Sequence, residues 1–285
     1  MKNNTVIAFV DDSKYSNIVC QYAAWLASQN NSKIKIYHVI EKKNERQGKD
    51  LSGAINLGAR TTLLETLTEY SASSSKARHT EGWAILAKAN ATLKSVGNFT
   101  VEPRLRTGDV AEALSRKEGK ADIVLIGKRG EVKQESQSKL GLNFERIVRA
   151  SKKPIFVANR NFRKIKKILV GFDGSPATRR IIDFIGGYDF LSSAEVTLAQ
   201  ANKGKGASEK NLLEAEGKLN ASGVLVKIEE LSGDPKVQLS KLIVERDFDL
   251  LAIGAYGHSK VRSFILGSTT TQLIQTVKVP VLLIR

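Results

Sequence analysis

The sequence predicts an α/β protein of two tandem doubly wound domains, each a five-stranded parallel sheet with helices on both faces. Three observations carry this prediction. The chain has 285 residues, a length that favours two domains of ordinary size. Short β-branched runs alternate with amphipathic stretches of helical period, as in βαβ units. An internal repeat places the same order of elements in both halves.

The repeat is clearest at the first strand and at the fourth. TVIAFVDDSKYS at 5–16 aligns with KILVGFDGSPAT at 167–178, an offset of 162. ADIVLIGKRG at 121–130 aligns with FDLLAIGAYG at 248–257, an offset of 127, and the later segments together give an offset of about 126. The first half therefore contains about 36 additional residues, and the alignment places them between 41 and 98.

Apolar, β-branched runs predict five strands in each half, separated by helices. The expected strands lie at 5–11, 33–40, 100–106, 122–127 and 154–159, and at 166–172, 194–201, 224–231, 249–254 and 280–285. The additional segment at 41–98 is rich in Ala, Leu, Glu and Lys and predicts one or two long helices, with SASSSK at 71–76 as a candidate break. A short basic linker, ANRNFRKIKK, joins domains that we expect at 1–160 and 161–285.

Composition narrows the class of protein. The single cysteine, Cys20, cannot form an internal disulfide, which points to a reducing compartment. The N-terminal apolar run is too short for a signal peptide, and no stretch approaches a membrane span, so we expect a cytoplasmic protein.

The formal charge of +16 would attract anionic partners. Because the basic residues are dispersed and few aromatics lie among them, a solvated basic surface is favoured over a nucleic-acid site.

A glycine-rich loop follows the fourth strand of the second half. The segment IGAYGHSKVRSFILGSTTTQ contains Gly254, Gly257 and Gly267, and Ser268 then begins a helical stretch. Glycines at a strand end let backbone amides approach an anion, and a helix N-terminus suits phosphate oxygens. Glycines also permit ordinary turns, and Ser or Thr also cap helices. From these residues alone, a phosphate cradle and a structural turn stay open in equal measure.

The loop spacing, Gly-x2-Gly-x9-Gly-(Ser/Thr), resembles the ATP-binding signature of the universal stress protein family. ILVGFDGSPAT and VPVLLIR also resemble the family's first and last strands, so the chain looks like a tandem member. The resemblance implies that Asp173 and the backbone of Ala201 contact the adenine or its ribose. It also implies that the loop surrounds the triphosphate, with Mg²⁺ carried by the nucleotide. The implied ATP-binding residues are Asp173, Ala201, Gly254, Gly257, Gly267, Ser268 and Thr269.

The first half departs from this signature. Ten residues separate Gly130 from Gly141, and Leu142 and Asn143 stand where the second half has hydroxyls. Two cations in the loop could hold phosphates, and Asn143 could cap the following helix. We therefore expect a degenerate second site, either inactive or altered. Its candidate residues are Asp11, Val39, Gly127, Lys128, Arg129, Gly130, Gly141 and Asn143.

Several other sites have no support in the sequence. There is no Gly-x4-Gly-Lys-(Ser/Thr) loop, no HExxH and no cysteine cluster, so neither a P-loop nor a protein metal site is expected. No catalytic base can be identified, and hydrolysis of a bound nucleotide, if any, would be slow.

The resemblance implies an ATP-binding regulatory protein of the stress response that acts through partner proteins. The alternative is a nucleotide-independent scaffold in the same response. A nucleic-acid binder rests on charge alone. The family also implies pairing of the last strands, PIFVANR and PVLLIR, which would make the two halves a pseudo-dimer, with a further homodimer left open.

Overall fold

The computed structural model describes residues 4–41, 57–130, 140–188, 191, 193–202, 209–255 and 266–285. The described residues form the ten predicted strands, with ends within two residues of the expected positions. The strands are β1 (Thr5–Phe9), β2 (Lys33–Ile40), β3 (Val101–Thr107), β4 (Ile123–Gly127), β5 (Ile155–Ala158), β6 (Lys167–Gly171), β7 (Glu195–Asn202), β8 (Leu225–Ser232), β9 (Leu250–Gly254) and β10 (Val281–Ile284).

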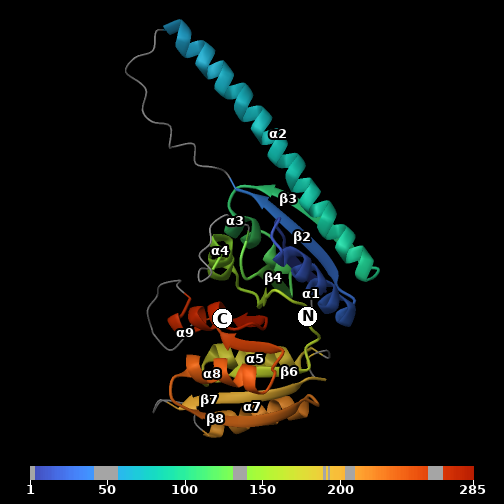
Figure 1. Ribbon diagram of the computed structural model, residues 1–285. Helices are drawn as coiled ribbons and strands as arrows, with labels where there is room; N and C mark the ends of the chain where they lie inside the picture. The colour runs from blue at the N-terminus through green and yellow to red at the C-terminus, as the bar shows by residue number, and fades with distance from the viewer. Residues whose placement is uncertain are drawn as a thin grey trace.

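Helices connect most of these strands (Figure 1). They are α1 (Tyr15–Asn30), α2 (Leu57–Val96), α3 (Val110–Ser115), α4 (Leu142–Ala150), α5 (Pro176–Gly186), α7 (Glu209–Ala221), α8 (Pro235–Glu245) and α9 (Ser268–Thr276), with a short 3-10 turn, η2 (Glu118–Lys120). In the part of the chain that the structure describes, no helix is long and apolar enough to cross a membrane.

All ten strands belong to one sheet, in the order β3-β2-β1-β4-β5-β10-β9-β6-β7-β8. Neighbours within each half are parallel, whereas β5 and β10 are antiparallel. Phe156 lies opposite Leu282 at this central junction. Both strands are apolar and fully buried, so neither could face water as a free edge. The expected pairing of the two halves through their last strands is confirmed.

Helices cover both faces of the sheet, which confirms the doubly wound architecture. Successive strand residues point to opposite faces. One face packs against α1, α2, α5 and α7, through buried residues such as Val19, Leu86 and Ile181. The other face packs against α3, α4, α8 and α9, through residues such as Phe144 and Leu273.

The additional segment of the first half contains one helix of 40 residues, α2, and the serine-rich stretch at 71–76 does not break it. The expectation of a break was wrong because serine costs only about 0.5 kcal/mol relative to alanine inside a helix. The last turns of α2 are anchored by the buried Leu86 and Leu93. Figure 1 shows the earlier part of α2 extending beyond the sheet.

Candidate functional site

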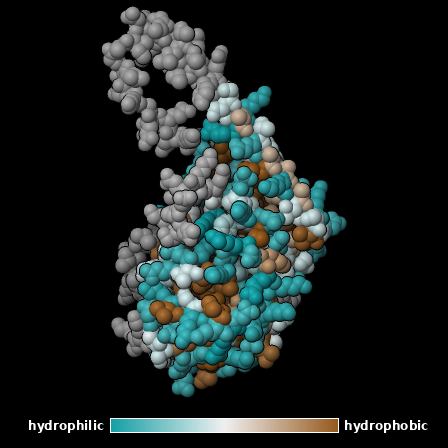
Figure 2. All heavy atoms as spheres, in the orientation of Figure 1, coloured by the Kyte–Doolittle hydropathy of each residue, from teal (hydrophilic) through white to brown (hydrophobic). Residues whose placement is uncertain are grey.

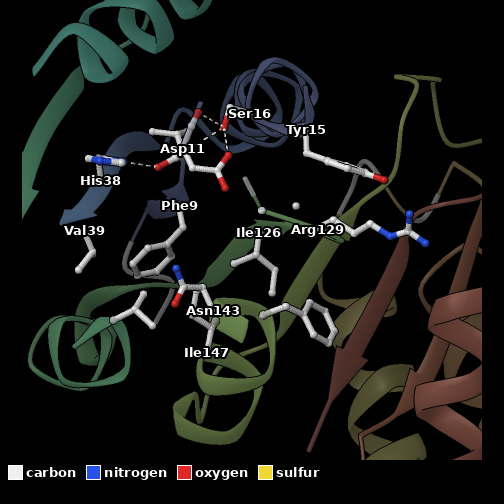
Figure 3. Close-up of a pocket in the computed structure, with 15 residues that line it drawn as sticks. Phe9, Asp11, Tyr15, Ser16, His38, Val39, Ile126, Arg129, Asn143 and Ile147 are labelled. Atoms are coloured by element: carbon white, nitrogen blue, oxygen red, sulfur yellow. Dashed lines mark hydrogen bonds between the residues drawn. The ribbon is translucent and has the colours of Figure 1, made fainter. Parts of the chain in front are cut away.

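Each half has one place where its strand order reverses. β1 lies beside β4, and β6 lies beside β9. From these central neighbours the chain builds the sheet outward in two directions, so ligand crevices are expected at the carboxyl ends of these strands. In the first half this edge holds a pocket between the β1–α1 turn, β2 and α4 (Figure 3).

The pocket of the first half is lined by both apolar and polar residues. Its lining residues are Phe9, Val10, Asp11, Tyr15, Ser16, His38, Val39, Val110, Ile126, Gly127, Arg129, Gly130, Asn143, Phe144 and Ile147. Figure 3 shows Phe9, Val39, Ile126 and Ile147 grouped on one side, with Asp11 and Ser16 opposite. A cavity that combines apolar side chains with a few placed polar groups suits a small organic ligand.

The two candidate aspartates have matching environments. Asp11 Oδ1 accepts hydrogen bonds from the Ser13 amide (3.0 Å) and the Ser16 hydroxyl (2.9 Å). Asp173 Oδ1 accepts them from the Ser175 amide (2.9 Å) and the Thr178 hydroxyl (3.0 Å). One oxygen of each carboxylate thus closes the turn between the first strand and the first helix of its half. The turn-forming role of these residues is therefore observed directly.

Glycines bring the loop after β4 close to the β1–α1 turn. A Cβ atom on Gly127 would lie 2.6 Å from Tyr15 Cβ, and one on Gly130 would lie 2.9 Å from Asp11 Oδ2. A Cβ on Gly141 would lie 3.0 Å from the Gly130 amide nitrogen. Larger residues would force these segments apart. The predicted residues Asp11, Gly127, Gly130 and Gly141 are therefore brought together at one edge of the sheet.

Lys128 does not face the pocket, contrary to the expectation that it could hold a phosphate there. It is 7% exposed, and its ammonium donates hydrogen bonds to the carbonyls of Gln275 (2.9 Å) and Val277 (3.0 Å) in the second half. These carbonyls lie at the C-terminal end of α9, where cations are favoured. Burial, with the charges of Arg129 and Arg160, lowers the pKa of Lys128 to about 8.

Two further residues of the first loop also differ from expectation. Asn143 lies inside the first turn of α4, because the N-cap is Gly141 and no side chain caps it. Asn143 lines the pocket but is not the predicted cap. Figure 3 shows the Arg129 side chain running away from Asp11 toward the second half. The Arg129 Nε is buried and has no hydrogen-bond partner among the described residues.

In the second half, the strand end and the start of α9 are tied together. The Thr270 hydroxyl donates to the Gly254 carbonyl (3.0 Å), and the Gly267 amide donates to the Ala255 carbonyl (3.3 Å). Gly267 is the N-cap of α9 and makes no side-chain capping bond. Ser268, which is exposed, and Thr269 form the first turn. Gly257 lies outside the described residues.

The remaining predicted contacts come from the second strand of each half. Val39 lines the first pocket and is the penultimate residue of β2. Ala201 occupies the same position in β7. Next to Val39, the ring Nδ1 of His38 lies 2.9 Å from the Val10 carbonyl oxygen, which agrees with a structural role at the strand end.

Sequence reasoning missed Tyr15 and Ser16 in the pocket, and the buried Thr270. All three follow or precede a predicted residue by a few positions. The sequence repeat could have identified Ser16, because Thr178, also a hydroxyl residue, stands at the matching position. In the structure both hydroxyls bond to the aspartate of their own half. Nothing in the run STTT distinguishes the threonine that turns inward. Among the described residues, no group of three or more His, Cys, Asp or Glu side chains could hold a metal ion.

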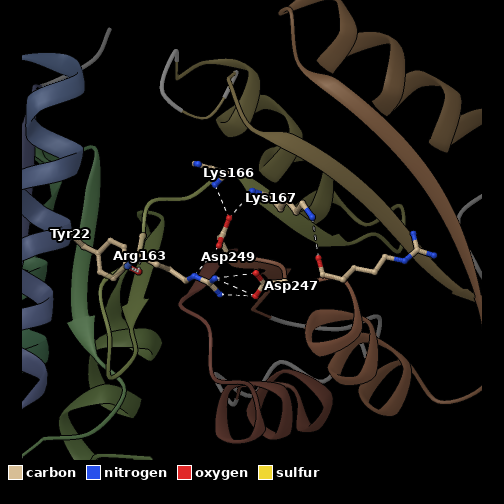
Figure 4. Close-up of polar contacts among 7 residues, drawn as sticks. Tyr22, Arg163, Lys166, Lys167, Asp247 and Asp249 are labelled. Atoms are coloured by element: carbon tan, nitrogen blue, oxygen red, sulfur yellow. Dashed lines mark hydrogen bonds and ion pairs between the residues drawn. The ribbon is translucent and has the colours of Figure 1, made fainter.

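The linker adds a second junction between the halves (Figure 4). Arg163 forms ion pairs with Asp249 (Nε–Oδ1, 2.9 Å) and Asp247 (Nη1–Oδ1, 3.2 Å) of the second half. The Tyr22 hydroxyl of α1 accepts from the Arg163 amide (3.2 Å) and donates to its carbonyl (3.3 Å). The other Asp249 oxygen accepts from the amides of Lys166 (2.9 Å) and Lys167 (3.0 Å). The linker is thus bonded to both halves.

Comparison with known proteins agrees with this architecture. The model of the universal stress protein family matches residues 2–159 and 187–285. A universal stress protein of Synechocystis sp., Slr1230, is 33% identical over 290 residues, covering 100% of both chains. Universal stress protein Rv2624c of Mycobacterium tuberculosis is 32% identical over 136 residues, covering 42% of this chain and 48% of its own. A universal stress protein structure from Archaeoglobus fulgidus superposes with a TM-score of 0.70 at 19% identity, covering 100% of this chain and 99% of that one. The chain therefore belongs to the universal stress protein family, as a tandem member with two copies of the family's fold.

Proposed function

We propose that this protein is an ATP-binding regulator of the stress response, which holds the nucleotide mainly in its C-terminal half and acts through partner proteins. We propose the boundary between its two domains at residues 160 and 161. The nucleotide would lie across the carboxyl ends of β6 and β9, with Mg²⁺ brought by the triphosphate. Asp173 and the backbone of Ala201 would contact the adenosine part, and Gly254, Gly257, Gly267, Ser268 and Thr269 would surround the phosphates.

The arrangement of Gly254 and α9 is the observation that supports this proposal most. The hydrogen bonds from Thr270 to Gly254 and from Gly267 to Ala255 hold the start of α9 against the end of β9. Because Gly267 makes no side-chain cap, no side chain of that residue competes for the first-turn amides. Such amides, with the positive end of the helix dipole and the hydroxyls of Ser268 and Thr269, suit phosphate oxygens.

The first half is less suited to a triphosphate. Lys128 is committed to the carbonyls at the end of α9, and the Gly130 amide lies close to the N-cap residue of α4. The hydroxyls of Ser268 and Thr269 have no counterpart in Leu142 and Asn143. We therefore assign the first half a lower affinity for ATP.

The test is the nucleotide content of the protein purified from cells without added nucleotide. Heat denaturation followed by anion-exchange chromatography should release a single adenine nucleotide per chain. The variant Gly257→Val should lose it, because a branched side chain in the loop would displace the phosphates. The matched variant Gly130→Val, at the same position of the repeat, should keep it.

Each other outcome has a definite meaning. Two nucleotides per chain would contradict the assignment to the C-terminal half. A protein that is empty and also fails to bind added MgATP would overturn the proposal and leave the nucleotide-independent scaffold. Partner action is tested separately, by comparing the proteins that wild type and Gly257→Val capture under stress; identical capture would remove the nucleotide from the regulatory role.

A further inference from the structure

The two outer edges of the ten-stranded sheet differ. One edge is β3, which contains Pro103 and the charged residues Glu102, Arg104 and Arg106. Proline removes a backbone donor and interrupts the row of groups that an added strand would pair with, so β3 is protected against strand addition. The other edge is β8, LVKIEELS, which contains no proline and pairs with β7 on one side. Among the described residues, no strand pairs with the outer side of β8, so β8 is the unprotected edge of the sheet.

The β8 edge also exposes apolar side chains. Leu225 is 75% exposed and Ile228 is 38% exposed, although both belong to a regular strand. Figure 2 shows apolar side chains interrupting the hydrophilic surface in the lower part of the molecule, where β8 and α8 lie in Figure 1. An exposed strand with apolar residues and unpaired backbone groups is a template for another strand.

We propose that β8 pairs antiparallel with β8 of a second copy of this chain, about a twofold axis at Ile228. Alternate residues of a strand direct their backbone groups to the same side. In a symmetric pair of identical strands, opposite residues must therefore be an even number apart, and the axis must pass between the two copies of one residue. This condition leaves few registers, and the charges of β8 distinguish among them.

An axis at Lys227 would place lysine opposite lysine, and an axis at Glu229 or Glu230 would place glutamate opposite glutamate. Like charges directly opposite one another are destabilising. An axis at Ile228 instead places Ile228 opposite its own copy, Lys227 opposite the copy's Glu229, and Leu225 opposite the copy's Leu231. This register pairs opposite charges twice and uses residues 225–231, nearly the whole strand.

Both charged side chains are already held on the same face of the sheet. Lys227 forms an ion pair with Glu195 of β7 (2.9 Å), and Glu229 forms one with Arg246 (2.6 Å). Residues 227 and 229 point to the same side of β8 because side chains alternate along a strand. The two copies would thus meet with ordered and complementary charges. Since a single pair of strands buries little surface, we expect a weak dimer that forms as concentration rises.

Sedimentation of the full chain over a range of concentrations tests for the dimer. The mass should rise from that of one chain, 31.2 kDa, toward twice that value. The variant Lys227→Glu should weaken association at least tenfold, because it places glutamate opposite Glu229 of the copy. The double variant Lys227→Glu/Glu229→Lys should recover it. Arg106→Glu on β3 is the control and should leave the association unchanged.

A disulfide trap tests the register itself. Opposite residues of an antiparallel pair have Cα atoms about 4.5–5.5 Å apart, within reach of a disulfide. Ile228→Cys should give a covalent dimer on mild oxidation, whereas Val96→Cys, 52% exposed on the first half, should not. Cys20 is buried and would not interfere. A chain that stays monomeric would show that β8 does not pair with a second copy, which overturns the proposal. A dimer that is insensitive to both β8 changes uses another surface and does the same.

Discussion

The loops that follow β4 and β9 occupy the same place in the repeat but have different roles. After β4, Lys128 leaves the pocket of its own half and binds the C-terminal carbonyls of α9. After β9, the matching residue is Ala255, which is buried and has no charged side chain that could bind across the junction. The junction is nevertheless reciprocal, because Arg285 of the second half donates to the carbonyls of Arg149 (3.2 Å) and Ser151 (2.9 Å) at the end of α4.

This difference shows how two copies of one fold can divide their tasks. Each half supplies a cation to the C-terminal end of a helix in the other half, where the partial negative charge favours it. The second half supplies its cation from the end of β10 and leaves the loop after β9 without a cation at position 255. The first half supplies Lys128 from the loop itself. A cation used at the junction is lost to the pocket, which agrees with assigning ATP to the second half.

The largest expected effect tests this division directly. Ser268→Glu places a carboxylate in the first turn of α9, where we propose that phosphates bind. The affinity for MgATP should fall about 100-fold or more, close to 3 kcal/mol, because like charges would meet at the proposed site. The helix itself should tolerate the change, since acidic residues are favourable in a first turn. Titration calorimetry measures the affinity, and thermal unfolding checks the fold.

The control for this prediction is Asn143→Glu, the same kind of change in the first turn of α4. Asn143 is exposed and lines the first pocket. Nucleotide affinity should be unchanged in this variant. An equal loss in both variants would mean that the two halves share the nucleotide, and the contrast between them would fail.

A second effect concerns the junction and depends on pH. Burial lowers the pKa of Lys128 to about 8, from 10.5. Between these values the unfolded chain binds more protons than the folded one, so this residue adds stability as pH rises from 8 toward 10.5. Below pH 8 both states carry the charge, and the folded state bears the cost of burying it. The unfolding free energies of wild type and Lys128→Met should therefore diverge in favour of wild type by roughly 1–3 kcal/mol across this window.

Denaturant unfolding of both proteins at pH 7.5 and pH 10 measures this change. Other titrating groups are common to the two proteins, so their effects cancel in the difference. A difference that stays flat with pH would show that Lys128 keeps an ordinary pKa. The Lys128 ammonium would then not be desolvated at the junction between the halves.

Local pattern predicted most of the fold because each strand is a short apolar run ended by a polar turn. β1 illustrates both the success and its limit. The expected strand reached Asp11, but the observed strand ends at Phe9, because Asp11 bonds to Ser13 and Ser16 in the following turn. The pairing of β5 with β10 came from the family resemblance and from the need to cover two apolar edges.

The direction of a loop side chain could not be predicted in the same way. Lys128 and Gly127 are neighbours, yet Gly127 lies in the pocket and Lys128 points across the junction. The partner of Lys128 is the carbonyl of Val277, 149 residues away in sequence. A sequence shows that a cation follows the strand; only the packing of α9 against the first half shows where its charge is required.

The smallest effect concerns the helix that sets the first half apart. α2 runs through SASSSK without interruption, whereas its counterpart in the second half, α7, spans Glu209–Ala221 among the described residues. If α2 tolerates its serines only because each one lowers the helix stability slightly, then replacing one serine by alanine should raise the free energy of unfolding slightly. Ser75 is exposed, so Ser75→Ala should raise the unfolding free energy by about 0.3–0.5 kcal/mol, the difference in helix propensity. Denaturant unfolding of the wild type and the variant measures it. A loss of stability instead would mean that the Ser75 hydroxyl makes a needed contact, and that this part of α2 is held by more than propensity.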